Sequence, residues 1–255
     1  MIQRKTEEEI AVMKEGGRKL GTILKQLLAF AQPGVSLLDI DSYAGALIKT
    51  SGATPSFTTV KGYHWPTCLC VNEVVVHGVP TRRKLIDGDV LTIDIGLVFG
   101  GFHTDTAWTK IVGEDRSADK AKKEQFLAVG QEALKKAIRL ARIGAKVGDI
   151  SQSTQRIIEG AGFSIVKSLV GHGVGHELHE DPQVPNYLRG AKENTYQFQG
   201  GETIAIEPIY AMGDGSIVYE NDDGWTLATR DRSISAVFEH SIAIMPDGPL
   251  VLTEA

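Results

Sequence analysis

The sequence repeats one pattern of glycines, acids and apolar residues after about 110 positions. Gly34, Asp39, Ile40 and Gly52 correspond to Gly144, Asp149, Ile150 and Gly162. At a nearly equal offset, the segments Gly88–Asp94 and Gly201–Glu207 both alternate apolar residues and end in a carboxylate. Two matches in the same order indicate a duplicated unit. We therefore expect one domain, residues 1–255, made of two related α+β halves of about residues 1–110 and 111–255.

Each half is predicted to begin with two helices. In the first half, Thr6–Glu9 has the spacing of a capping box, and the helical pattern after it ends at Pro33-Gly34. Ser36–Asp39 opens a second helix by the same signal, and Gly52 is expected to end it. In the second half, the segments that precede Gly144 and Gly162 also have helical patterns. A site between two such halves would collect residues from both.

Composition excludes several classes of protein. With 42% hydrophobic and 23% charged residues the chain is an ordinary globular protein, and its net charge of -5 argues against nucleic acid as a ligand. It contains no apolar run of about 18 residues and no basic-then-apolar signal peptide, so we expect a cytoplasmic protein without a membrane span. Cys68 and Cys70 are separated by one residue and are expected to be reduced thiols.

Acidic residues occur inside strands that are otherwise apolar. Asp94 lies within the apolar segment Val90–Phe99, and the pair Gly100-Gly101 predicts a hairpin turn to a second strand that contains Asp105. A turn centred between the glycines places Asp94 opposite Ala107, so both acids share one face as diagonal neighbours, roughly 7 to 8 Å apart at Cα. Two such carboxylates repel each other unless a proton or a cation lies between them.

Two further acids and a group of histidines extend this pattern. Glu207 and Glu239 lie in strand-like apolar segments, and the glycine-rich segment 171–182 contains His172, His176 and His179. Solvated loop histidines are the alternative for that segment alone. Carboxylate oxygens together with imidazole suit Mn, Fe or Co, and four carboxylates carry enough charge for two divalent cations. The sequence therefore predicts a metal site.

With these residues placed, the chain resembles the type I methionine aminopeptidases, a family of metallopeptidases with the pita-bread fold. That fold implies two pseudo-symmetric α+β halves around a curved antiparallel sheet with helices outside. The resemblance covers nearly the whole chain. It rests on the ordered set His77, Asp94, Asp105, His172, His179, Glu207 and Glu239.

The resemblance implies two divalent metal ions, with Co, Mn or Fe expected and Zn or Ni as further candidates. Two ligands, Asp105 and Glu239, would bridge the ions. One ion would be held by Asp105, His172, Glu207 and Glu239, and the other by Asp94, Asp105 and Glu239.

The implied activity is removal of the initiator methionine from peptides and nascent chains, with a preference for a small second residue. A water or hydroxide that bridges the metals would attack the peptide bond. As in the family, Glu207 would carry the proton towards the leaving amine, and His77 and His179 would donate hydrogen bonds to the substrate. A monomer with transient ribosome association is expected.

Methionine recognition would need an apolar pocket beside the metals. Four residues match the family's pocket positions or lie near them: Tyr63, Trp65, Cys68 and Trp225. Ordinary core packing is the alternative for each aromatic, and the segment 62–72 is a few residues shorter than in common bacterial members. Asn72, Val74 and Ser235 match positions where the family holds a monovalent cation.

Four rival functions use the same residues. An Xaa-Pro peptidase of this fold usually carries a large extra amino-terminal domain, for which the segment before His77 leaves no room. A type II methionine aminopeptidase usually has an insertion that the segment between His179 and Glu207 does not accommodate. A peptide- or ribosome-binding module typically loses metal ligands, and a mononuclear iron site would leave at least three acids unexplained.

Overall fold

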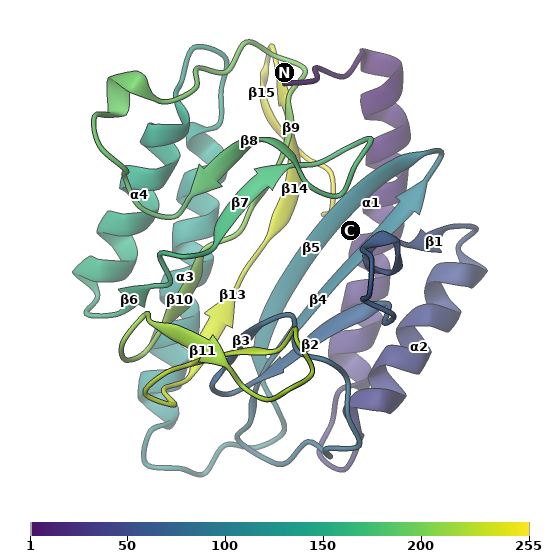
Figure 1. The fold of residues 1–255 in the computed structure, drawn as a ribbon, viewed down its shortest axis with the longest axis vertical. Coiled ribbons are helices and arrows are strands. Elements are labelled where there is room, and N and C mark those ends of the chain that lie inside the picture. Colours follow the sequence, from purple (N-terminus) through teal and green to yellow (C-terminus); the bar gives the residue numbers. More distant parts are fainter. Residues whose placement is uncertain (1, 255) are drawn as a thin grey trace.

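Helices cover the outside of a curved layer of antiparallel strands (Figure 1). The structure is a computed structural model that describes residues 2–254. Two helix pairs follow the order predicted from the sequence, and the strands between and after them form the layer that carries the acidic residues. No helix within residues 2–254 combines the length and hydropathy needed to cross a membrane.

The first helix pair consists of α1 (Glu7–Phe30) and α2 (Leu37–Thr50). Both begin with the predicted capping boxes. At α1, the Glu9 backbone N–H donates to Thr6 Oγ1 over 3.2 Å, and the Thr6 N–H donates to Glu9 Oε2 over 2.8 Å. Ser36 and Asp39 make the same exchange at α2. These caps satisfy amide groups that have no partner within the helix.

The second pair, α3 (Lys120–Leu140) and α4 (Val147–Gly160), repeats the first in order and nearly in length. The repeated glycines have the same backbone conformation. Their φ angles are 91° and 77° at Gly34 and Gly52 and 84° at both Gly144 and Gly162. Only glycine adopts this left-handed conformation without steric cost, so the repeat in the sequence follows a repeat of backbone shape.

Within residues 2–254, four groups of paired strands form the layer. The first joins β1 (Thr54–Pro55), β4 (Val90–Phe99), β2 (Thr67–Val71) and, on β4, β5 (Phe102–Ile111). The largest has the order β15 (Gly248–Val251), β14 (His240–Met245), β9 (Thr203–Ile206), β7 (Val170–Gly173) and β8 (Glu180–Pro185). The two smaller groups are β13 (Ser235–Val237), β10 (Ile209–Ala211), β6 (Ser164–Ile165) and β11 (Ile217–Tyr219), β12 (Leu227–Thr229), β3 (Val74–Val76).

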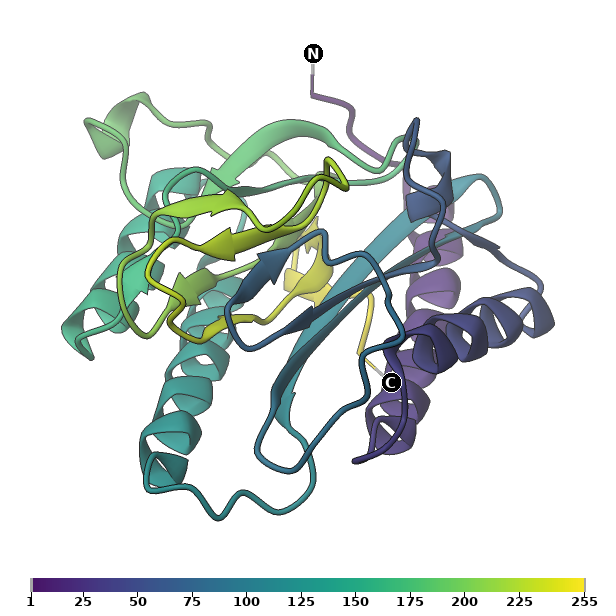
Figure 2. The same ribbon diagram turned by 60° about the horizontal axis from the view of Figure 1, so that its bottom comes forward.

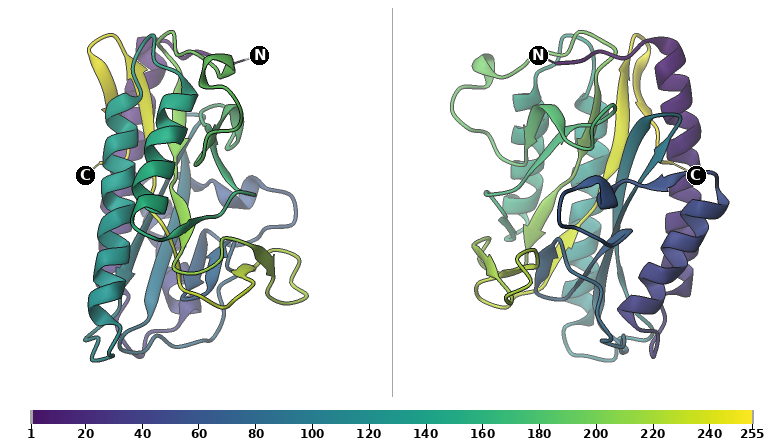
Figure 3. Two further views of the ribbon diagram at one scale, coloured as in Figure 1. Left: turned by 90° about the vertical axis from the view of Figure 1, so that its left-hand side faces the viewer. Right: turned by 45° about the vertical axis from the view of Figure 1, so that its right-hand side comes forward.

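Two short 3-10 helices, Phe57–Thr59 and Lys192–Asn194, interrupt the connections. Figure 2 shows β11, β12 and β3 side by side in front of the long β4–β5 hairpin. The left view of Figure 3 places α3 and α4 on one side of the strands and the β11–β12 hairpin on the other.

The β4–β5 hairpin has the predicted register. Asp94 pairs with Ala107, and Gly96 pairs with Asp105. Gly100 and Gly101 form the turn with φ angles of 59° and 86°, as expected for a two-residue turn with both central residues left-handed. Asp94 and Asp105 consequently project from the same face of the hairpin.

The hydrophobic core has two large parts. One packs α1 and α2 against β2 and β4, with Leu27, Ile40 and Ile93 among its fully buried members. The other packs α3 and α4 against β9, β10 and β14, around Phe126 and Tyr210. Trp108 on β5 contacts both parts. The acids lie on the strands that separate the two, where side chains from both can meet.

Candidate metal centre and active site

Five elements bring the predicted metal ligands together. Asp94 lies on β4, Asp105 on β5 and His172 on β7. Glu207 connects β9 to β10, and Glu239 connects β13 to β14. The predicted ligands therefore come from one hairpin, β4–β5, and from three segments much later in the sequence.

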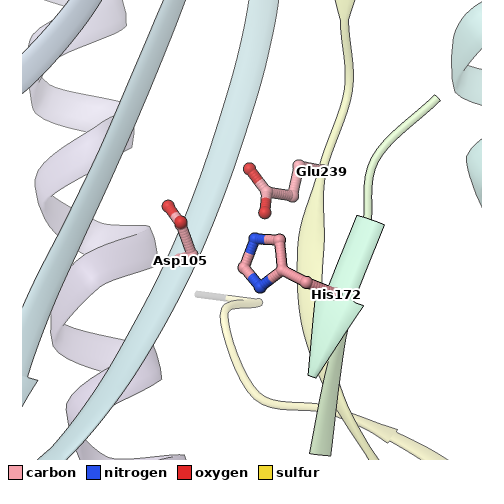
Figure 4. A group of neighbouring side chains, drawn as sticks. All are labelled: Asp105, His172 and Glu239. Atoms are coloured by element: carbon pink, nitrogen blue, oxygen red, sulfur yellow. The ribbon is translucent and has the colours of Figure 1, made fainter. Parts of the chain in front are cut away.

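Three of these side chains converge closely. One ligand atom each from Asp105, His172 and Glu239 lies within 4.8 Å of the others, and Figure 4 shows the Glu239 carboxylate over the imidazole ring and the Asp105 carboxylate beside it. All three residues are at most 8% exposed. Glu207 joins the group because its Oε1 lies 3.4 Å from His172 Nε2. The geometry suits a cation that prefers oxygen and imidazole ligands.

Burial and mutual repulsion raise the pKa values of the acids. Burial raises the pKa of Asp94 to about 7. It raises the pKa values of Asp105 and Glu239 well above their usual range, and the neighbouring carboxylates raise them further. Burial and the charge of Asp94 do the same for Glu207. The protein alone thus disfavours four negative charges here, and a cation would stabilise them.

Unpartnered oxygen atoms point to the same conclusion. Within the described residues, Asp94 Oδ1, Asp105 Oδ1 and Glu239 Oε1 are buried without a hydrogen-bond partner. Leaving a buried acceptor unsatisfied costs about 1 to 3 kcal/mol, more if it is charged. Metal coordination would satisfy all three atoms, so the residues present fit a metal centre.

His172 is prepared to act as a neutral ligand. Its Nδ1 lies 2.8 Å from the carbonyl oxygen of Gly173. Since a carbonyl can only accept, Nδ1 carries the proton and Nε2 presents a lone pair to the acids. Burial, followed by the nearby His179, lowers the pKa of His172 to about 4. The ring is therefore uncharged at neutral pH.

The other two predicted histidines face the space above the acids. His77 and His179 are exposed at a cavity of about 650 Å³, and the rings of His179 and His172 are 4.5 Å apart between centroids. Partial loss of water around each ring, and for His77 also the nearby His179, lowers both pKa values. His77 has a φ of 55°, a strained conformation for a non-glycine residue.

Most of the predicted pocket residues line this cavity. Tyr63, Cys68 and Trp225 are in its wall, and the Tyr63 and Trp225 rings meet edge-on at 5.2 Å. Trp65 packs edge-on against Tyr63, also at 5.2 Å, and is not itself part of the cavity lining. Both cysteines are buried and unpaired.

Sequence reasoning did not assign several residues of the cavity wall to the methionine pocket. Apolar contacts are made by Phe57, Val60, Leu178 and Ile209. Their sequence context is that of ordinary core residues, so no local signal distinguishes them. His176, which lies between two site histidines in the sequence, is exposed and has its Nε2 3.7 Å from Glu9 Oε1 on α1.

The three residues predicted to hold a monovalent cation lie together. Ser235 Oγ donates to the carbonyl of Val74 over 2.9 Å and to that of Asn72 over 3.3 Å. Asn72 has a φ of 56°, which turns the chain between β2 and β3. Two carbonyl oxygens and a hydroxyl thus converge here.

Four carboxylates, with Asp105 and Glu239 buried and Asp94 and Glu207 half-buried, line a cavity together with a neutral imidazole, which is the ligand set of a metal-dependent enzyme. The chain belongs to metallopeptidase family M24, whose family model matches residues 11–245. Bacillus subtilis methionine aminopeptidase 1 is 40% identical over 253 residues, which cover 99% of each chain. The predictions of the family and of a hydrolase are confirmed.

Solved structures agree with this assignment. The methionine aminopeptidase of Thermotoga maritima matches with a TM-score of 0.93 and 38% identity over 100% of both chains. A prolidase of Pyrococcus furiosus has a TM-score of 0.79 at 21% identity, and the match covers 99% of this chain but 65% of that chain. The prolidase shares the fold alone. The predicted pita-bread fold is confirmed.

Proposed function

We propose that this chain is a methionine aminopeptidase that removes the initiator methionine from peptides and nascent proteins. The observation that carries the proposal is the convergence of Asp105, His172 and Glu239 beneath a cavity with an apolar wall. Full-length similarity to named methionine aminopeptidases supports it. An Xaa-Pro peptidase is not favoured, because the named methionine aminopeptidases match over the whole chain. A non-catalytic binding module is not favoured either, because every metal-ligand position is filled.

Two divalent cations, Mn, Fe or Co with Zn and Ni as further candidates, are proposed at the acidic cluster. The unpartnered oxygens of Asp94, Asp105 and Glu239 support more than one ion. When bound, such ions lower the pKa of a shared water and polarise the substrate carbonyl. One ion would be held by Asp105, His172, Glu207 and Glu239, and the other by Asp94, Asp105 and Glu239.

Protein side chains are proposed to transfer the proton and to donate hydrogen bonds to the substrate. Glu207 is proposed to accept a proton from the attacking water and to pass it to the leaving amine. His77 and His179 are neutral, because their pKa values are lowered, and each has one N–H to donate. Donation to the amide and to the developing oxyanion would stabilise the transition state.

The methionine side chain is proposed to lie against Tyr63, Cys68 and Trp225, with Trp65 supporting the wall. Tyr63 is fixed by a 2.8 Å hydrogen bond from its hydroxyl to the carbonyl of Thr67. A thioether gains affinity from burial and from contact with aromatic rings. A small second residue is expected beyond this pocket.

Further properties are proposed with the activity. Asn72, Val74 and Ser235 would hold a monovalent cation through oxygen atoms. The two α+β halves would form a single catalytic domain that acts as a monomer. A cytoplasmic location and transient ribosome contact follow from the proposed substrate, because nascent chains emerge there.

Methionine release tests the proposal directly. Protein stripped of metal is titrated anaerobically with Mn, Fe or Co in the presence of Met-Ala-Ser, and free methionine and oxygen consumption are measured. The proposal expects methionine release that depends on metal and consumes no oxygen. A folded, metal-loaded protein that releases no methionine would favour the binding module, and oxygen consumption would favour the iron site.

A further inference from the structure

A buried lysine from the amino-terminal segment reaches the loop that carries His179. We call residues 174–181 the histidine loop. Lys5 Nζ forms an ion pair with Glu180, the residue directly after His179, although the two partners are 175 positions apart. The two side chains are 1% and 8% exposed. A pair so well buried is held in one geometry, and loss of either partner leaves an uncompensated charge.

Both members of the pair are fixed at their other ends. The Lys5 backbone N–H donates to the carbonyl of Gly201 over 2.7 Å, and Thr6 next to it caps α1. The second oxygen of the Glu180 carboxylate accepts the N–H of Glu177 over 3.1 Å. One carboxylate therefore closes the turn before His179 and attaches it to the start of α1.

The histidine loop also packs directly against this lysine. A Cβ added at Gly175 would lie 2.3 Å from Lys5 Cε, so the loop backbone touches the lysine stem. The carbonyl of Gly175 accepts the N–H of His103 on β5 over 2.7 Å. Figure 3 (right) shows the amino-terminal segment crossing over the strands to reach α1. The position of the loop is thus set by distant parts of the chain.

We propose that Lys5 is a positioning residue, which holds the histidine loop through Glu180 so that His179 can donate to the substrate. The inference rests on the proposed function. Nothing in the metal cluster requires Lys5, because its contacts are with the loop, with Gln3 and with Gly201. Its effect should therefore fall on the step in which His179 acts.

Steady-state kinetics of Lys5→Met on Met-Ala-Ser tests the inference. Methionine keeps the apolar stem and removes the charge. Since a misplaced catalytic group costs on the order of 100-fold, we expect kcat to fall about 10- to 100-fold with little change in KM. Metal content should equal that of the wild type. Lys123→Met is the matched control, because Lys123 forms another buried ion pair, with Asp115 at 2.9 Å, away from the cavity. That variant should keep the wild-type kcat per bound metal.

A double-mutant cycle separates positioning from general destabilisation. If Lys5 acts through His179, then adding Lys5→Met to His179→Ala should lower kcat by less than about 2-fold, because the two residues form one unit. Lys5→Arg, which keeps the charge, should recover most of the rate. Glu180→Gln keeps the size of the side chain and should lower kcat as much as Lys5→Met does. It replaces Lys5→Met in the test if that variant does not fold.

Hydrogen exchange supplies a measurement that is independent of activity. Amides of residues 174–181 should exchange faster in Lys5→Met than in the wild type, while those of α3 do not. Unchanged exchange in the loop, a wild-type kcat, or losses that multiply fully in the cycle would overturn the inference. If the wild type itself releases no methionine, the proposed function fails, and the exchange experiment still decides whether Lys5 holds the loop.

Discussion

Asp105 interacts electrostatically with three other acids of the cluster: Asp94, which is its neighbour in the hairpin, and also Glu207 and Glu239. Its pKa is raised by burial and by the charges of Asp94 and Glu207, while its Oδ1 has no hydrogen-bond partner. The charge of such a carboxylate is compensated only when a cation lies beside it. Substitutions at this scale should therefore separate metal binding from substrate binding.

Asp105→Asn keeps the shape of the side chain and removes its charge. Because the proposed role is a ligand to both ions, we expect metal content to fall and methionine release to drop by more than about 100-fold. Elemental analysis and the Met-Ala-Ser assay measure the two effects. Glu124→Gln on α3, an exposed acid 3.7 Å from Lys120, is the control and should match the wild type. Full activity in Asp105→Asn would contradict the dinuclear site.

Trp225→Ala should affect substrate binding instead. The ring is part of the cavity wall and contacts Tyr63, while its backbone N–H is held by Asp223 at 2.8 Å. Loss of this apolar area weakens ground state and transition state alike, so we expect KM to rise about 10-fold with kcat nearly unchanged. Steady-state kinetics on peptides that begin with Met measure the change in KM. An unchanged KM would remove Trp225 from the methionine pocket.

At the scale of elements, the helices are held against the strands by close approaches at glycines. Gly17 of α1 lies against the backbone of Leu252, where a Cβ would come within 2.4 Å of the carbonyl oxygen. Gly130 of α3 similarly lies against the Tyr210 side chain. Helix propensity alone would favour alanine at both positions, so tertiary packing decides the residue.

Gly17→Ala should therefore destabilise the protein. We expect the free energy of unfolding to fall by about 1 to 3 kcal/mol, because a backbone atom cannot move aside as a side chain can. Gly160→Ala in α4 is the matched control, since a Cβ there meets nothing within 4 Å, and it should leave stability equal or raise it by about 0.5 to 1 kcal/mol. Chemical denaturation measures both. Equal stability of the two variants would contradict the packing argument.

The same scale shows what sequence patterns predict well. Capping boxes and the Gly100-Gly101 turn are local, so the helix starts and the register of Asp94 and Asp105 could be predicted without the structure. The contact of Lys5 with Glu180 joins segments that only the whole fold brings together, and neither residue carries a local signal. His176 lies between two site histidines in the sequence, yet the loop turns it away towards Glu9.

For the whole molecule, the main electrostatic feature is the set of carboxylates with raised pKa values. Without metal, the folded state holds protons that the unfolded state releases, so these acids stabilise the fold at low pH and lose that contribution as pH rises through their folded pKa values. Histidines with lowered pKa values act in the opposite direction, but only below about pH 6.5, where the unfolded histidines are charged.

Between about pH 6.5 and 8, the acids should therefore dominate. We expect the metal-free protein to lose stability as pH rises through this window, and saturating Mn to abolish the slope because the cation replaces the protons. Thermal or chemical unfolding across the window, with and without metal, measures the effect. Metal-free stability that rises with pH in this range would show that the cluster does not hold protons.

The order of the ligands along the chain has a consequence for synthesis. The first helix pair and the β4–β5 hairpin can form early, yet they supply Asp94 and Asp105 alone, while His172, Glu207 and Glu239 come from later segments. A chain stopped before Glu239 would hold Asp94, Asp105, His172 and Glu207 without the last ligand. Such a product cannot assemble the proposed centre, so peptidase activity would begin only after nearly the entire polypeptide has been made.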